Sequence, residues 1–171
     1  MIYSKSNPVG IDIKINSIQN KLHAAFLALP LVTGQIDLYG RVYKLKEGLK
    51  TTPVKFITEF NKGLFTTDKT IVGYFFERTD PVNTNGMFST TIGNIFHVNL
   101  KAVYPSITHR ADEEFTKLIT DIYSREPYGF KTLSISTGID RVYSDFNFEE
   151  SIEDIPPYFS IRFDLNINYR I

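Results

Sequence analysis

The last thirteen residues constrain the fold more than any other segment, because apolar and polar side chains alternate there without interruption. A period of two is typical of a β-strand with one buried face. At ~3.3 Å per residue, Phe159–Ile171 would reach on the order of 40 Å, whereas a usual strand has about five or six residues. We therefore predict a central strand whose buried face consists of Phe159, Ile161, Phe163, Leu165, Ile167, Tyr169 and Ile171.

The other face of this predicted strand carries charged and amide side chains: Arg162, Asp164, Asn166, Asn168 and Arg170. We interpret this face as too polar for a second core layer. It would meet a neighbouring subunit, the wall of a water-filled channel, or plain solvent. On this interpretation, replacing Arg162 or Arg170 by alanine leaves the stability of the isolated subunit nearly unchanged and weakens assembly.

Two segments have the apolar spacing of three and four that is typical of an amphipathic helix. The first stripe begins at Ile11, with Asp12 as a candidate N-cap and Pro30 ending the helix. The second helix is expected from about Arg110 to Tyr123, with acidic residues in its first turn, where they favour the helix dipole. The first stripe contains Ile11, Ile15, Ile18, Leu22, Phe26 and Leu29, and the second Phe115, Leu118, Ile119, Ile122 and Tyr123.

Further strands are predicted from β-forming residues and alternation, at Gln35–Leu45, Thr70–Arg78, Ile95–Tyr104 and Phe130–Ile139. Residues 46–69 are ambiguous, with Val54–Phe60 apolar enough for a short strand or a helical turn. Residues 1–10 are expected to be an irregular arm, and Asp140–Pro157 irregular and acidic. The fold class that follows is α+β, a mostly antiparallel twisted sheet with two amphipathic helices packed on one face. We expect a single domain over residues 1–171.

The segment Thr79–Gly93 is predicted to be a long interaction loop. It contains Pro81, the pair Asn85-Gly86 and a run of Ser and Thr. At about fifteen residues it exceeds most connections, and long loops usually carry a function or lack fixed structure. We expect it to become ordered against a neighbouring subunit, so that deleting Asn83–Ser89 would spare folding and impair assembly.

Composition excludes several kinds of site. The chain has no Cys, so disulfides, thiolate metal sites and Cys nucleophiles are excluded. Its 19 basic and 19 acidic residues give a net charge of zero, which does not predict a concentrated phosphate-binding face. The longest apolar stretch, around Ala24–Val32, is interrupted by Pro30 and is too short for a bilayer, so we expect no membrane partner.

The candidate metal-binding and acid–base residues are scattered. His23, His97 and His109 do not have the helical spacing of a metal site, and His97 is expected on the outward face of a strand. His109 with Asp112 and Glu113 could be a ligand cluster, but the start of a helix explains them as well. The remaining carboxylates, for which we favour a solvated loop over a cation site, are Glu149, Glu150, Glu153 and Asp154, with Asp140 and Asp145 as a weak pair.

No motif for a nucleophile elbow, a phosphate-binding loop or a dinucleotide fold occurs in the sequence. Basic and aromatic residues on one predicted strand, Arg41, Tyr43, Lys44 and Lys46, could face nucleic acid, but an ordinary exposed strand explains them as well. We therefore predict no catalytic, cofactor-binding or metal-binding residues, no cofactor and no enzyme activity.

The order of elements resembles that of the tail-terminator and neck-ring family of tailed bacteriophages, in particular ring proteins of crAss-like phage tails. The resemblance covers roughly residues 11–171 and lies mostly in the second half, in the segments IFHVNLKAVYP, ADEEFTKLITDIY, FKTLSISTGIDRVY and YFSIRFDLNINYRI. In that family an α+β subunit forms a closed ring between head and tail.

The resemblance implies a structural virion protein that is assembled in the host cytoplasm. It would form a ring of six or twelve copies, connect the portal or head to the tail, and line the DNA channel. Implied partners are copies of itself, portal or other connector and tail proteins, and passing DNA through non-specific contact. Two alternatives stay open: a monomeric module that binds a ligand or protein, and a small enzyme with a dispersed active site.

Overall fold

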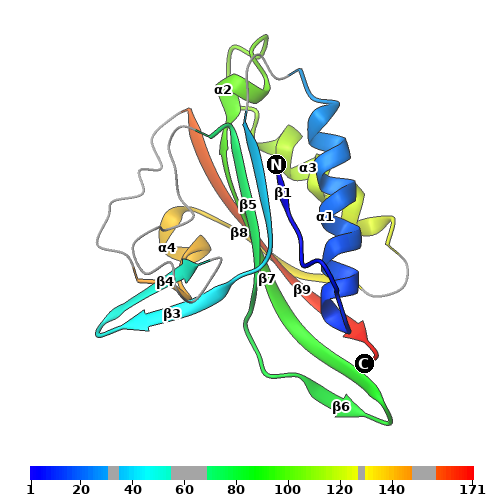
Figure 1. Cartoon of the computed structure of the whole chain (residues 1–171). Helices are drawn as coiled ribbons and strands as arrows, with labels where there is room; N and C mark the ends of the chain where they lie inside the picture. Colours follow the sequence, from blue (N-terminus) through cyan, green and yellow to red (C-terminus); the bar gives the residue numbers. More distant parts are fainter. Residues whose placement is uncertain (31–34, 55–68, 127–129, 148–156) are drawn as a thin grey trace.

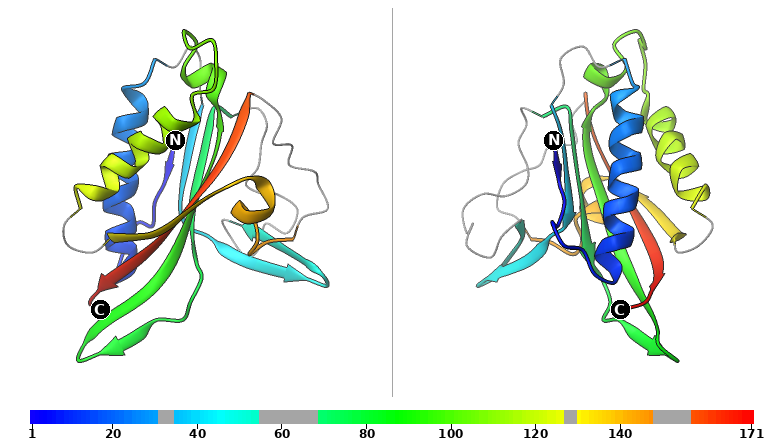
Figure 2. Two further views of the ribbon diagram at one scale, coloured as in Figure 1. Left: turned by 180° about the vertical axis from the view of Figure 1, so that it is seen from behind. Right: turned by 45° about the vertical axis from the view of Figure 1, so that its right-hand side comes forward.

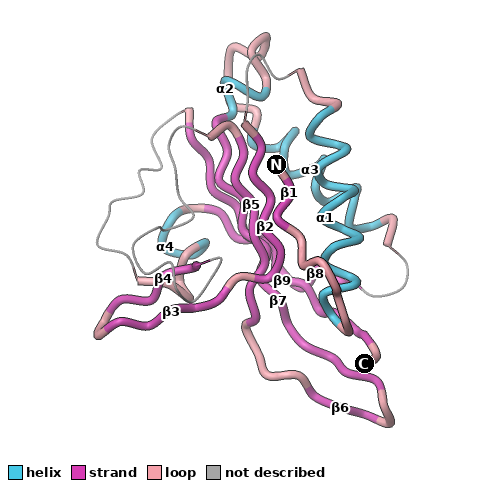
Figure 3. Tube along the Cα trace, viewed as in Figure 1, coloured by secondary structure: helices cyan, strands magenta, loops and turns pink. Residues whose placement is uncertain are grey.

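The computed structural model describes residues 1–30, 35–54, 69–126, 130–147 and 157–171. The described part is an α+β fold with a mixed, mostly antiparallel sheet and four helices. Figure 3 shows most of the strands gathered in one twisted sheet, from which a small separate hairpin projects. The single-domain expectation is compatible with this arrangement but stays a prediction.

The main sheet has the order β1-β2-β5-β7-β9-β8, with β6 paired to β7 beyond this path. The β1–β2 and β2–β5 pairs are parallel, and the remaining pairs are antiparallel. A separate antiparallel hairpin is formed by β3 and β4. The bounds are β1 Ile2–Tyr3, β2 Ile36–Arg41, β3 Tyr43–Glu47, β4 Lys50–Val54, β5 Ile71–Glu77, β6 Val82–Thr84, β7 Met87–Asn99, β8 Phe130–Thr137 and β9 Tyr158–Tyr169.

The helices are α1 Ile11–Leu27, α2 Leu100–Val103, α3 Asp112–Ser124 and α4 Ile139–Val142. Both long helices were predicted, and most of each apolar stripe is buried. Leu118 and Ile122 of α3 are partly buried, as is Leu29, which lies beyond the end of α1. The predicted cap at Asp12 is wrong, because Gly10 holds the N-cap position and makes no side-chain cap. Asp12 instead lies in the first turn, where its carboxylate accepts hydrogen bonds from Lys5 at 2.9 Å and Arg41 at 3.0 Å.

The core on the first face of the sheet is built from α1, α3 and the strands beneath them (Figure 2). Phe26 on α1 stacks with Phe115 on α3 at 5.6 Å, and both rings meet Phe96 of β7 edge-on. The hydroxyl of Tyr123 donates to Asn94, so the one amide that β7 turns into this layer is satisfied. Aromatic packing of this kind adds to the area buried.

The opposite face of the sheet carries a second, smaller core, which the sequence did not lead us to expect. It contains Val72, Tyr74 and Phe76 of β5 with Ile95 of β7. The segment 139–147 covers them through the buried side chains of Val142, Tyr143 and Phe146. The prediction that Asp140–Pro157 is irregular is therefore wrong for its first part, which includes most of α4, while residues 148–156 lie outside the described part.

The predicted final strand is confirmed as β9, which lies between β7 and β8 and pairs along its whole length with β7. Its apolar face is buried from Phe159 to Tyr169, but Ile171, predicted on that face, lies beyond β9 and is 85% exposed. The prediction for its polar face is wrong for the first part of the strand and holds for Asn168 and Arg170, which are exposed. Ser160, Arg162 and Asp164 are 1%, 5% and 4% exposed, because the segment 139–147, Arg78 and Ser134 pack around them.

The prediction of a long loop over Thr79–Gly93 is also wrong. Asn85 and Gly86 have φ of 52° and 79°, and they form the tight turn between β6 and β7. Asn-Gly tolerates two consecutive positive φ values, which suits the twist of a two-residue hairpin. The side chain of Asn83 accepts from the Gly86 amide at 3.0 Å. The residues from Met87 onward belong to β7, and Phe88 pairs with Tyr169 of β9, so deleting Asn83–Ser89 would also shorten the central ladder.

Other predicted bounds change where a strand is interrupted. Gln35–Leu45 divides at Val42, whose side chain joins the second core and whose amide donates to Phe75 at 2.8 Å. The strand predicted to run to Tyr104 ends at Asn99, whose side chain caps α2. The predicted irregular arm contains β1, and Val54 ends β4, while residues 55–60 lie outside the described part.

Candidate functional site

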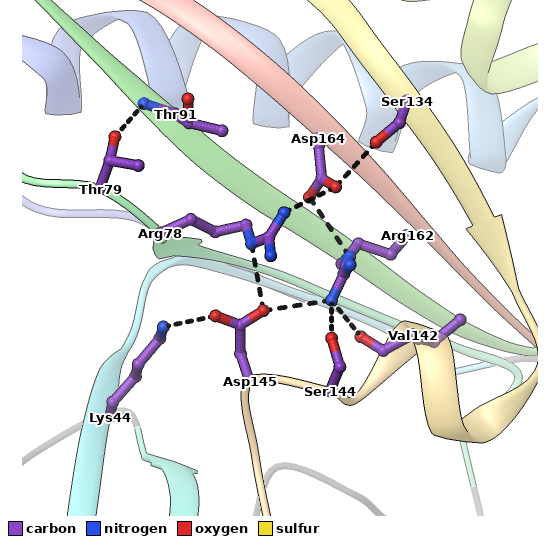
Figure 4. A network of polar contacts seen from close by, with 10 residues as sticks. All are labelled: Lys44, Arg78, Thr79, Thr91, Ser134, Val142, Ser144, Asp145, Arg162 and Asp164. Carbon is purple, nitrogen blue, oxygen red and sulfur yellow. Dashed lines mark hydrogen bonds and ion pairs between the residues drawn. The ribbon is translucent and has the colours of Figure 1, made fainter.

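The densest group of charged side chains lies on the second face of the sheet, where β9, β5 and the segment after α4 meet (Figure 4). Arg162 and Asp164 lie two residues apart on β9 and point to the same side. Arg78 follows β5, and Asp145 follows α4. We call these four residues, with Lys44 of β3, the charge network.

Arg162 is the centre of the charge network. Its terminal nitrogen donates to the carbonyl of Val142 at 3.1 Å, to Ser144 at 2.9 Å and to Asp145 at 3.2 Å. Its Nε lies 3.2 Å from Oδ1 of Asp164. The three hydrogen bonds come from the one terminal nitrogen, and the buried Nε has the ion pair but no hydrogen-bond partner. A buried guanidinium depends on such compensation for its lost hydration. These contacts tie the segment 139–147 to the sheet.

Arg78 bridges the two carboxylates of the charge network. It donates to Asp145 at 3.1 Å and to Asp164 at 2.9 Å, while Ser134 of β8 adds a hydrogen bond to Asp164 at 2.9 Å. Both oxygens of Asp145 are engaged, since Lys44 binds the other at 3.0 Å. Oδ2 of Asp164 accepts both of its hydrogen bonds, whereas its buried Oδ1 lies 3.2 Å from Nε of Arg162 as an ion pair without a hydrogen bond.

The hydrogen bonding of these carboxylate oxygens limits the chemistry that the charge network can perform. A metal ligand or a general base needs an oxygen with a free lone pair directed at an open position. Here both oxygens of Asp145 and Oδ2 of Asp164 already accept hydrogen bonds. The remaining oxygen, Oδ1 of Asp164, is buried beside Nε of Arg162, so no open position lies next to it. The charge network therefore connects β9, β5 and the segment after α4. It also connects the β3–β4 hairpin to the sheet, because Lys44 of β3 binds Asp145 and lies 4.9 Å from the centre of the Phe76 ring.

His97 and Ser160 form a second polar group on the same face. They are cross-strand partners on β7 and β9, with Nδ1 of His97 2.9 Å from Oγ of Ser160. The Tyr143 hydroxyl lies 3.3 Å from the same oxygen. Burial lowers the pKa of His97 to about 4, so the ring is neutral near pH 7. The expectation that His97 faces outward is wrong, since it is 7% exposed.

A serine beside a neutral histidine is the pair used in nucleophilic catalysis. Ser160 is only 1% exposed, however, so a substrate cannot reach its oxygen. No carboxylate among the described residues hydrogen-bonds the ring of His97. We interpret the pair as a satisfied cross-strand contact. Sequence reasoning missed it because register across β7 and β9 cannot be read from either strand alone.

The structure does not bring the other predicted candidates together. His23 lies on α1, where burial lowers its pKa, and His109 lies in the exposed connection before α3. Asp112 is bound by Arg110 at 2.6 and 3.1 Å. Within the described ranges, no group of three or more potential metal-ligating side chains occurs. The acidic residues Glu149, Glu150, Glu153 and Asp154 lie outside those ranges.

The basic and aromatic strand face is also divided. Arg41 turns back to Asp12 and Glu77, and Lys44 turns to Asp145, whereas Tyr43 is exposed. Two of its cations are thus already neutralised. Asp140 and Asp145, predicted as a weak pair, have separate surroundings. Asp140 is exposed on α4, and Asp145 belongs to the charge network.

Comparison with protein-family models, with curated proteins and with solved structures finds no match to this chain. None of the helices in the described ranges combines the length and the apolar character needed to cross a membrane.

Proposed function

We propose that this chain is a structural virion protein whose copies form a closed ring in the neck or tail of a tailed phage. The ring would connect the portal or head to the tail, line the DNA channel, and consist of six or twelve subunits. The proposal rests on the resemblance in element order and on one structural observation, the open edge of the main sheet.

That open edge is β8, the last strand of the order, which has a partner on one side only among the described residues. It is eight residues long, and Leu133 and Ile135 on it are 52% and 42% exposed. Soluble proteins usually shorten, charge or cover such an edge, because it can pair with another chain. β8 does carry one charge, Lys131, and a register shift between Thr132 and Ser134. Its length and its exposed Leu133 and Ile135 nevertheless suit a subunit whose neighbour covers this edge.

Two hairpins supply further surfaces that would reach a neighbour. In Figure 1 the β3–β4 hairpin and the β6–β7 hairpin extend away from the body in different directions. Their exposed apolar residues include Leu49, Val82 and Met87, which are 90%, 64% and 37% exposed. A closed ring needs a heterologous interface, in which one face of a subunit meets a different face of the next. A sheet edge and separate projecting hairpins suit that requirement.

We further propose that α1 and α3 form the single helical layer on one face of the sheet in the assembled ring. They would then leave β8 and both hairpins available to neighbouring subunits. Contact with DNA would be non-specific, since the net charge is zero.

Sedimentation velocity of the purified full chain over a range of concentrations tests self-assembly through β8. Wild-type protein is expected to form a closed species of six or twelve subunits. Ile135→Glu should shift it to monomer, because it places a charge in the proposed contact. Ile13→Glu, at an exposed isoleucine of α1, is the matched control and should sediment like wild type. A chain that stays monomeric at every concentration would refute the proposal.

A further inference from the structure

A groove at one end of the sheet is separate from the hairpins and from the charge network, and it touches β8 only at the last residue of that strand, Thr137. It has a volume of about 770 Å³. It lies between α2, the connection from α2 to α3, the turn from β8 to α4 and the beginning of β9. Its lining includes Lys101, Tyr104, His109, Arg110, Arg141 and Tyr158. A volume of this size fits a ligand or a few residues of a peptide.

The floor of the groove is already fixed in the free chain. Tyr158 stacks on His97 with ring centroids 5.4 Å apart and planes at 6°. The amide of Leu100 donates to the carbonyl of Pro157 at 2.9 Å, which ties α2 to the start of β9. The side chain of Asn99 caps α2 at Ala102. A preformed floor lowers the entropy cost of binding.

The charge of the lining is one-sided. Among the described residues that line it, four are basic or histidine and none is acidic. Arg110 is bound by Asp112, but Lys101 and Arg141 form no ion pair with any carboxylate in the described ranges. They come from different elements, Lys101 from α2 and Arg141 from α4. Two cations without an ion-pair partner in one groove complement an anionic ligand.

The apolar part of the lining favours a peptide over other anions. Leu100, Ile107, Pro105 and Pro157 suit aliphatic side chains, and the ring of Tyr158 already stacks on His97. Tyr104 and His109 are the further rings in the lining, so an oligonucleotide is the alternative to be tested. Tyr and Arg around an apolar centre are typical of protein interfaces. We propose that the groove binds a short extended segment of another protein, in which carboxylates alternate with apolar side chains.

That the bound protein is a neighbour in a virion rests on the proposed function. That the groove binds such a segment does not depend on the proposed function. The groove shares only Thr137 with β8 and includes neither Leu133 nor Ile135, the exposed β8 residues proposed for ring contact. Peptide binding and ring formation can therefore be measured as separate properties of the same sample.

The test uses the full chain and a fluorescein-labelled hexapeptide in which aspartate alternates with leucine, followed by fluorescence polarisation. Saturable binding is expected. It should weaken on the order of tenfold in Arg141→Glu and in Lys101→Glu, because each reversal turns an attraction into a repulsion. Lys46→Glu, at an exposed lysine of β3 outside the groove, is the charge-matched control and should bind like wild type.

Two further probes separate the alternatives. A hexapeptide alternating lysine with leucine should not bind, and tighter binding of an oligothymidylate than of the acidic peptide would overturn the proposal in favour of nucleic acid. Equal loss in Lys46→Glu, or no saturable binding of the acidic peptide, would also overturn it. The sedimentation coefficient of Arg141→Glu should equal that of wild type. Equality shows that ring formation does not depend on the groove.

Discussion

The structure and the sequence pattern predict different effects of Arg162→Ala on the stability of the subunit. The period of two predicts an outward side chain whose loss leaves the subunit stable. The structure buries it at 5% exposure, with three hydrogen bonds and an ion pair to Asp164. Removal leaves the buried carboxylate of Asp164 with one cation fewer and leaves the carbonyl of Val142 without this donor.

The expected loss is about 3–5 kcal/mol in the free energy of unfolding, the usual cost of removing one partner from a buried ion pair. Urea unfolding of the isolated subunit measures it. Arg170→Ala is the matched control, because Arg170 has the same place in the alternation but is exposed, and its loss should lie within about 0.5 kcal/mol of zero. Equal losses in the two variants would refute the burial of this network.

A double-mutant cycle tests whether the two charges of the pair depend on each other. Asp164→Ala alone should also be destabilising, because it leaves the guanidinium of Arg162 with less compensation. The double variant should lose less than the sum of the single losses, by about 0.5–3 kcal/mol. Additive losses would show that the two side chains do not interact.

Three further outcomes follow from the packing and the buried histidine. Phe163→Ala should cost about 2–5 kcal/mol in unfolding free energy through the cavity it leaves. Gly93→Ala should destabilise by about 1–3 kcal/mol, because its Cβ would lie 2.3 Å from Phe76, whereas Gly40→Ala, whose nearest atom is 3.5 Å away, should not. His97 has a folded pKa near 4, below its unfolded value near 6.5. Its contribution is therefore fully present above pH 6.5 and is lost as the pH falls towards 4, a slope that His97→Gln should remove from pH-dependent unfolding curves.

The long elements could be predicted from the sequence because each carries its own periodic signal. The stripes of α1 and α3 and the alternation of β9 need no knowledge of distant residues. The hairpin at Asn85-Gly86 could also have been predicted from the sequence, since Asn-Gly between β-forming residues is a strong turn signal. Pro81 and the run of Ser and Thr are typical of a loop, and the loop prediction followed these residues in place of the turn signal.

The second core layer and the charge network could not be predicted, because they depend on long-range pairing. A strand face with Arg162 and Asp164 looks exposed unless Arg78 and Asp145 are known to lie beside it, and these are 86 and 17 residues away from their partners in the network. The pairing of His97 with Ser160 joins residues 63 positions apart. Register of this kind is fixed by tertiary packing and by no local motif.

Electron microscopy of particles purified from the source of this chain tests the central claim most directly. The proposed function predicts ring-shaped density in the neck or tail with six- or twelvefold rotational symmetry, into which the α+β subunit fits with β8 against the next copy. Particles that lack the chain, or that contain it without rotational symmetry, would contradict the claim.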